Sequence, residues 1–138
     1  MPIGRVIAAL ESTKNQRSVA DERFIREQRI LDELAPRLWR EVRQALQGEC
    51  NAHPEYLTFE VQPEPLARIR CSNRRFLEVE YLSESKTVVF ELGEMQGEFA
   101  IRLDAQNRAV LFDGDGKVLP SAGYLADELL TLTLGGHS

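Results

Sequence analysis

Residues 76–92 read FLEVEYLSESKTVVFEL, and apolar and polar side chains alternate in the run on each side of Ser83–Ser85. Alternation with a period of two predicts β-strands that bury one face and expose the other. A connection this short cannot hold a crossover, so it predicts an antiparallel hairpin.

The same alternation extends from Tyr56 to Leu119, with further runs at 57–61 and 99–103. Turn-forming residues separate the runs at 72–73, 93–97, 104–107 and 113–116. None of these gaps has room for a crossover helix, which excludes a Rossmann or flavodoxin arrangement. We therefore expect an antiparallel β-meander of five to seven strands.

Before residue 50 the apolar period changes from two to that of a helix. From Asp21 to Gln47 a mostly apolar stripe falls within one arc at 100° per residue; its members are Phe24, Gln28, Leu31, Ala35, Leu38, Trp39, Val42, Ala45 and Leu46. Ser18 with Asp21 resembles a capping box, Pro36 predicts a kink or break, and Gly48 is a plausible stop.

A second helix is predicted after Pro120, where Ser121 can cap residues 122–134 ahead of Gly135 and Gly136. The fold class is therefore α+β, with a long N-terminal amphipathic helix, the meander, a C-terminal helix, and both helices on one face of the sheet. We expect a single domain over 1–138. The alternative for residues 1–17 is a loosely attached N-terminal segment.

The composition limits the classes of partner. A formal charge of −5 disfavours a general nucleic-acid or anionic-membrane binder. Two cysteines cannot form a secreted disulfide framework, and no stretch has the roughly 20 apolar residues of a membrane span. The N-terminal apolar run is short for a signal peptide, so we expect a cytoplasmic protein with no membrane partner.

Two motifs invite a metal, and neither has the required pattern. An EF-hand loop that starts at Asp113 needs an oxygen ligand at position 117 and a Glu at position 124, but these positions hold Lys117 and Tyr124. A glycine-rich turn is therefore favoured. The soft ligands Cys50, His53, Cys71 and His137 lack the spacing of a zinc site. We expect no metal and no cofactor.

The sequence contains no motif of a nucleophile, a phosphate loop or a metalloprotease, so we assign no catalytic residue. Several carboxylates are predicted on the outer face of the sheet and could serve a hydrolase, although neighbouring arginines favour a solvated charge lattice; they are Glu60, Glu78, Glu80 and Glu91.

The chain has one concentrated group of basic residues, which we consider as an anion-binding site on the hairpin around Cys71; it comprises Arg68, Arg70, Arg74 and Arg75. Only Phe76 adjoins it as an aromatic residue, whereas single-strand binders present several stacking rings. Nucleic acid is therefore an unfavoured partner. The favoured interpretation is that nearby glutamates neutralise the charge of these arginines.

The last helix carries more leucines than one buried stripe requires. Leu125, Leu129 and Leu132 form one face, which leaves other apolar residues of the two helices as interface candidates; these are Ile25, Ile30, Leu130 and Leu134. The alternative is that a helix wedged between the sheet and the long helix buries both faces without a partner.

The leading hypothesis is a non-enzymatic cytosolic module that binds a protein partner or itself as a homodimer. The first alternative is a small-molecule binder with a pocket between the sheet and the long helix, and the second is a hydrolase that uses the sheet carboxylates. Fold class alone does not choose among them.

Overall fold

The structure, a computed structural model, describes residues 3–135, with side chains from residue 21 onward. It contains two helices and one sheet of six strands. The elements are α1 (Ile3–Ala52), β1 (Leu57–Glu60), β2 (Leu66–Cys71), β3 (Phe76–Leu82), β4 (Thr87–Leu92), β5 (Met95–Leu103), β6 (Ala109–Phe112) and α2 (Ala122–Thr133).

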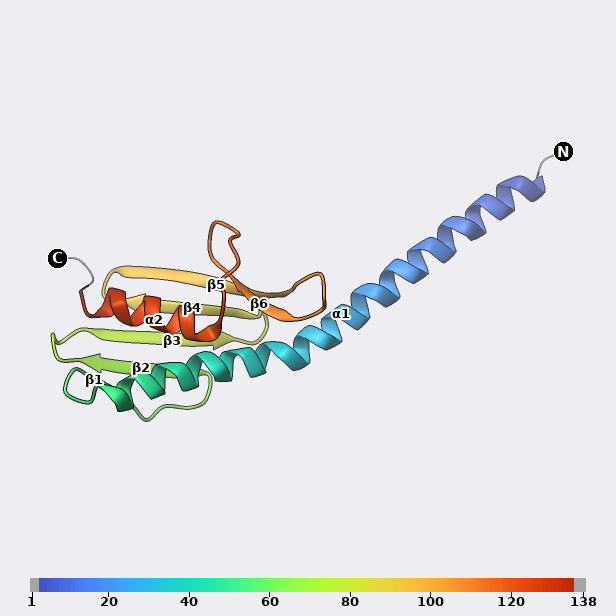
Figure 1. The fold of residues 1–138 in the computed structure, drawn as a ribbon. Helices are drawn as coiled ribbons and strands as arrows, with labels where there is room; N and C mark the ends of the chain where they lie inside the picture. Colours follow the sequence, from blue (N-terminus) through green and yellow to red (C-terminus); the bar gives the residue numbers. More distant parts are fainter. Residues whose placement is uncertain (1–2, 136–138) are drawn as a thin grey trace.

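The strands lie side by side in chain order, from β1 to β6, and every neighbouring pair is antiparallel. Both helices cover the same face of this meander (Figure 1). In β3, Leu77, Val79 and Tyr81 are buried beneath the helices, and the residues between them are exposed. These findings confirm the α+β fold class and the antiparallel meander.

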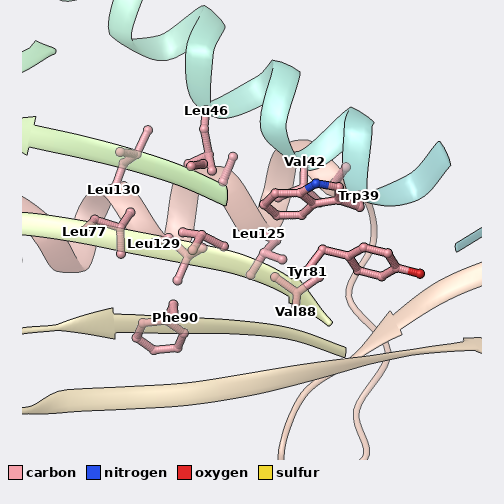
Figure 2. Packing of buried hydrophobic residues seen from close by; sticks show 14 of the residues in the cluster. Trp39, Val42, Leu46, Leu77, Tyr81, Val88, Phe90, Leu125, Leu129 and Leu130 are labelled. Carbon is pink, nitrogen blue, oxygen red and sulfur yellow. The ribbon is translucent and has the colours of Figure 1, made fainter. Parts of the chain in front are cut away.

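Helix α1 is held to the sheet by one buried stripe with helical spacing; the stripe consists of Leu31, Ala35, Trp39, Val42, Leu46 and Cys50. Trp39 is its largest member, stacks on Tyr81 with ring centroids 6.1 Å apart, and donates its Nε1 hydrogen to the Glu64 carbonyl oxygen at 2.8 Å. Figure 2 shows Trp39, Val42 and Leu46 directed from α1 into the cluster.

The predicted bounds of the long helix were wrong at both ends. α1 begins at Ile3, well before Ser18, and it continues past Gly48 to Ala52. Continuation past Gly48 places Cys50 in the core, and burial of that extra turn offsets the roughly 1 kcal/mol that an internal glycine costs.

The helix also runs through Pro36 without a break, so of the predicted kink or break the break does not occur. A proline removes one backbone hydrogen bond and crowds the preceding turn. Here the residues on both sides of it, Ala35 and Trp39, are fixed by burial against the sheet, and this packing keeps the helix continuous.

The predicted stripe was right from Leu31 to Leu46 and wrong at Phe24 and Gln28, which are exposed. The reason is tertiary: the body of the protein supports α1 only from about Leu31, and the preceding part of the helix projects beyond the sheet (Figure 1). Helical periodicity defines a face but does not indicate how far its neighbour extends.

Helix α2 begins as predicted, because the Ser121 hydroxyl oxygen accepts the backbone N–H of Tyr124 at 3.1 Å. Its buried face differs from the prediction, since Leu130 is buried and Leu132 is exposed. α2 packs beside α1 as well as on the sheet, so its buried arc is turned toward Leu130.

Leu46 tests the packing of α1, because its side chain is fully buried while the neighbouring Gln47 is exposed. Leu46→Ala should lower the free energy of unfolding by about 2–5 kcal/mol through lost burial and a residual cavity. Gln47→Ala should change it by less than about 0.5 kcal/mol. Guanidinium titrations followed by circular dichroism measure both, and similar effects would mean that a different face of α1 is buried.

Gly97 tests the fit between β4 and β5. A Cβ at this position would lie 2.7 Å from Cε1 of Phe90, whose buried ring stacks on Phe99. Gly97→Ala should therefore destabilise the fold by about 1–3 kcal/mol through overpacking.

Gly114→Ala is the matched control, because no heavy atom lies within 4 Å of its added Cβ. It should be neutral or stabilising by up to about 1 kcal/mol in the same titration. A Gly97→Ala protein as stable as this control would show that the Phe90 ring can move aside freely.

Candidate functional site

An exposed stretch of helix lies where α1 leaves the sheet. Residues 21–29, which we call the exposed helix segment, are all exposed to solvent. Two large apolar side chains occur in it, with Phe24 62% exposed and Ile25 50% exposed. The next residue, Ile30, is half-buried, so α1 meets the rest of the fold immediately after this segment.

The four predicted interface residues do not form one surface. Ile25 lies in the exposed helix segment, whereas Leu130 is only 5% exposed and belongs to the core. The expected exposure of Leu130 was therefore wrong, because α1 covers the side of α2 that we expected to be free. Leu134 is exposed just after the end of α2, at the other end of the α1–α2 pair.

A hollow of about 240 Å³ lies between the C-terminal ends of the two helices. We call it the α1–α2 groove; its polar lining includes Glu49 and His53 on the α1 side and Asp127 and Thr131 on α2. His53 Nε2 lies 3.9 Å from Glu49 Oε2. Leu134 supplies an exposed apolar side chain at the rim.

This groove is not the pocket that the small-molecule hypothesis predicts between the sheet and the long helix. Side chains of Trp39, Val42 and Leu46 occupy that space and are almost completely inaccessible to solvent. The volume of the groove is also below the roughly 300–1,000 Å³ that is typical of small-molecule sites.

The four arginines of the predicted anion site are not brought together. Arg68 Nε lies 3.2 Å from Glu60 Oε1 and 3.5 Å from Glu78 Oε1 on the outer face of the sheet. Arg75 instead donates from Nη1 to the Leu132 carbonyl oxygen at 3.3 Å, at the end of α2 on the opposite face.

Two of these arginines thus act within the fold. Arg68 also lies over the Phe76 ring, 4.4 Å from its centroid, which fixes the guanidinium against the sheet. Asn73, from the same turn as Arg75, donates from Nδ2 to the Thr133 carbonyl oxygen at 3.1 Å. Arg70 and Arg74 are exposed, and no ion pair is found for either one within the described part of the chain.

The sheet carboxylates occupy the uncovered face, as the alternation indicates. Glu78 stands directly opposite Glu91 in the β3–β4 register, and Glu60 and Glu78 share Arg68. A hollow of about 110 Å³ lies beside Glu78, Glu80 and Glu91, and a larger one of about 370 Å³ lies beside Glu91 and Glu98, so the pairing of the carboxylates with Arg68, and not the volume, bears on their role. The arrangement favours the solvated charge lattice over the hydrolase hypothesis.

Cys50 and Cys71 are both buried, one at the end of α1 and the other in β2. Burial, with a smaller contribution from the charge of Cys71, raises the pKa of the Cys50 thiol to about 11. A thiol with so high a pKa is largely protonated at neutral pH and is a poor nucleophile or metal ligand.

The metal motifs are accounted for by local structure where the structure describes them. Asp113 Oδ1 accepts the backbone N–H groups of Asp115 and Lys117, both at 2.9 Å, and Gly116 adopts a φ of 82°. The glycine-rich turn is therefore confirmed. His137 lies outside the described residues, and within them no cluster of three or more metal-ligating side chains occurs.

Comparisons with family models, with curated proteins and with solved structures found no match to this chain. In the portion that the structure describes, neither helix combines the length and hydropathy of a membrane span. The exposed helix segment could not be located from the sequence. Phe24 and Leu31 belong to the same helical pattern, and they differ in burial only because the sheet ends between them.

The Cys50 thiol predicts a pH dependence of stability. The pKa of Cys50 is about 11 in the folded protein, against an ordinary value of 9.0. The contribution of the protonated thiol to the free energy of unfolding is therefore fully present below pH 9 and is lost between about pH 9 and 11. Unfolding free energies from guanidinium titrations across this range should fall less steeply for Cys50→Ala than for the wild type. Gln47→Ala is the control, and parallel curves for all three proteins would contradict the assignment.

Proposed function

We propose that this protein is a non-enzymatic interaction module that self-associates through the exposed helix segment. The observation that carries the proposal is the pair Phe24 and Ile25, exposed on a helix that has left the support of its own sheet. Most helical stability in proteins comes from tertiary packing of an apolar face. A second helix supplies that packing where the body of the protein does not.

The charges of the exposed helix segment fit a second copy of the same helix. Three acidic and three basic residues give it no net charge, although the whole chain carries −5. In an antiparallel pair centred on Ile25, Asp21 lies level with Arg29 and Arg23 with Glu27, and no like charges are level with each other. A pairing of this kind has two-fold symmetry and closes as a dimer.

The apolar contribution is moderate. Full burial of Phe24 and Ile25 is worth about 1.5–3 kcal/mol for each side chain. The free energy gained by burying four such side chains in a dimer is comparable with the roughly 4–15 kcal/mol that association costs. The exposed helix segment therefore supports a dimer of modest affinity on its own, and tight association requires additional contact.

Light scattering on purified protein tests the proposal. The wild type should have the mass of a dimer, and Phe24→Glu combined with Ile25→Glu should give a folded monomer, because four charges would then meet at the centre of the pair. Both positions are exposed in the single chain, so the sheet and the buried part of α1 should remain folded, and circular dichroism should show at most the loss of helix that the second copy supported.

Val61→Glu combined with Met95→Glu is the matched control, because these apolar residues are exposed elsewhere, Val61 at 96%. This control should remain dimeric. A wild type that is monomeric at every concentration measured, or a control that dissociates as readily as the test variant, would contradict self-association through α1.

A further inference from the structure

Part of strand β5 lies at an open border of the sheet. β4 pairs with β5 from Met95 to Ala100, whereas β6 pairs with it only from Ala100 to Leu103. We call residues 95–99 the free β5 edge, because no strand of the described residues pairs with them on the side away from β4 (Figure 1). A sheet edge of this kind is a template for an added strand.

The backbone of the free β5 edge presents unused hydrogen-bonding groups. Ile101 donates its backbone N–H to the Lys86 carbonyl oxygen at 2.8 Å. In an antiparallel ladder every second residue bonds to the same neighbour, so Gln96 and Glu98 point their N–H and C=O groups away from β4. From residue 100 onward β6 pairs with groups that point in this direction, and at Gln96 and Glu98 they are left free.

The other borders of the sheet are closed by neighbouring backbone. At β1, the His53 carbonyl oxygen accepts the outward N–H of Leu57 at 3.0 Å, which leaves Phe59 as the other outward-facing residue of that strand. At β6, Leu119 donates its N–H to the Leu111 carbonyl oxygen at 2.8 Å. In the described part of the chain, successive unpaired groups therefore occur at the free β5 edge.

On the uncovered face of the sheet, the side chains beside this edge are acidic. A hollow of about 370 Å³ lies at the Phe90–Gly97 pair of β4 and β5. Glu91 and Glu98 line it and are exposed, and within the described residues no ion pair is found for either carboxylate. Basic side chains of an added strand would be level with these carboxylates and would pair with them.

On the face that the helices cover, the same edge is apolar. Met95 is 49% exposed and Phe99 is half-buried, and Gly97 between them has no side chain. An added strand would cover Met95 and Phe99 with its own side chains on this face. Since successive side chains of a strand point to opposite faces, the occupant that fits the edge alternates apolar and basic residues.

We infer that the free β5 edge binds an extended segment of a partner protein in which apolar and basic residues alternate. The segment adds to the sheet antiparallel to β5, the direction of every other pair in the sheet, and forms backbone hydrogen bonds with Gln96 and Glu98. Its basic residues lie level with these two residues. Its apolar residues lie level with Met95, Gly97 and Phe99.

The charge of the edge distinguishes this occupant from a second copy of the chain. Residues 94–101 include Glu94 and Glu98 and no basic residue, so the same edge of a second copy lacks the side chains that the hollow requires. Like charges placed together also oppose association. The free β5 edge lies on the sheet and not on the exposed helix segment, so binding here goes beyond self-association through α1 and does not depend on it.

Fluorescence anisotropy with labelled peptides tests the inference on the full chain. The probe is Val-Arg-Val-Arg-Val with fluorescein at its N-terminus and an amide at its C-terminus, and its binding should saturate. A peptide of the same composition with adjacent arginines loses the alternation, and one that is N-methylated at both arginines loses the backbone donors that face β5. Each should bind about tenfold more weakly or less. Equal binding of the three peptides, or no saturable binding of the probe, would overturn strand addition.

Amide hydrogen exchange measured by NMR locates the contact. When the probe is bound, the N–H groups of Gln96 and Glu98 should exchange about tenfold more slowly or less, because they become hydrogen-bonded. Phe59 is the internal control, since its N–H faces outward at the opposite border of the sheet. Binding that leaves Gln96 and Glu98 unprotected would contradict the assignment to this edge.

A backbone substitution gives an independent readout. Gln96→Pro removes an N–H that the sheet does not use, so the protein should fold and bind the probe about tenfold more weakly. Gln96→Ala keeps this N–H and should bind as the wild type does. A folded Gln96→Pro protein with unchanged affinity would overturn the inference, and the peptide comparison on the wild type is decisive if this variant does not fold.

Charge reversal tests the acidic hollow. Glu91→Lys combined with Glu98→Lys should weaken binding of the probe by about tenfold or more. Glu55→Lys combined with Glu84→Lys makes the same change in net charge at exposed turn positions and should have a smaller effect. Equal effects of the two pairs would mean that net charge alone attracts the probe. Phe24→Glu with Ile25→Glu should leave the affinity for the probe unchanged, which separates this site from the proposed self-association.

Discussion

The structure depends on the packing of Trp39 across the sheet. Its indole is buried, stacks on Tyr81 of β3, and donates a hydrogen bond to the Glu64 carbonyl in the loop between β1 and β2. These contacts fix the rotation of α1 about its axis and its position over the sheet. The buried stripe from Leu31 to Cys50 and the place beside α1 where α2 packs both follow from that orientation.

The same orientation determines which parts of the molecule are left uncovered. Because α1 is longer than the sheet is wide, its first part projects, and Phe24 and Ile25 are exposed although they continue the helical pattern. Because α1 and α2 end together, an acidic groove forms between their ends. The proposed self-association is therefore a consequence of the length and alignment of one helix.

The local features of the fold could be predicted from the sequence, and the tertiary ones could not. Alternation in residues 76–92 predicted the hairpin of β3 and β4, and Ser121 predicted the start of α2, because each depends on neighbouring residues. The burial of Leu130 and the exposure of Phe24 depend on how far another element extends. The groove joins Glu49 to Asp127 across most of the chain, and no local pattern indicates that contact.

The order of the strands has a consequence for the folding reaction. Each strand pairs with its neighbours in the chain, so the sheet is built from hairpins that close short loops and pay little entropy to form. α1 contacts β1 near its own end but also β5 and β6, which are far along the chain. The contacts of α1 with β5 and β6 therefore close much longer loops than the hairpins do, and in a growing chain they become available only after β6 has been synthesised.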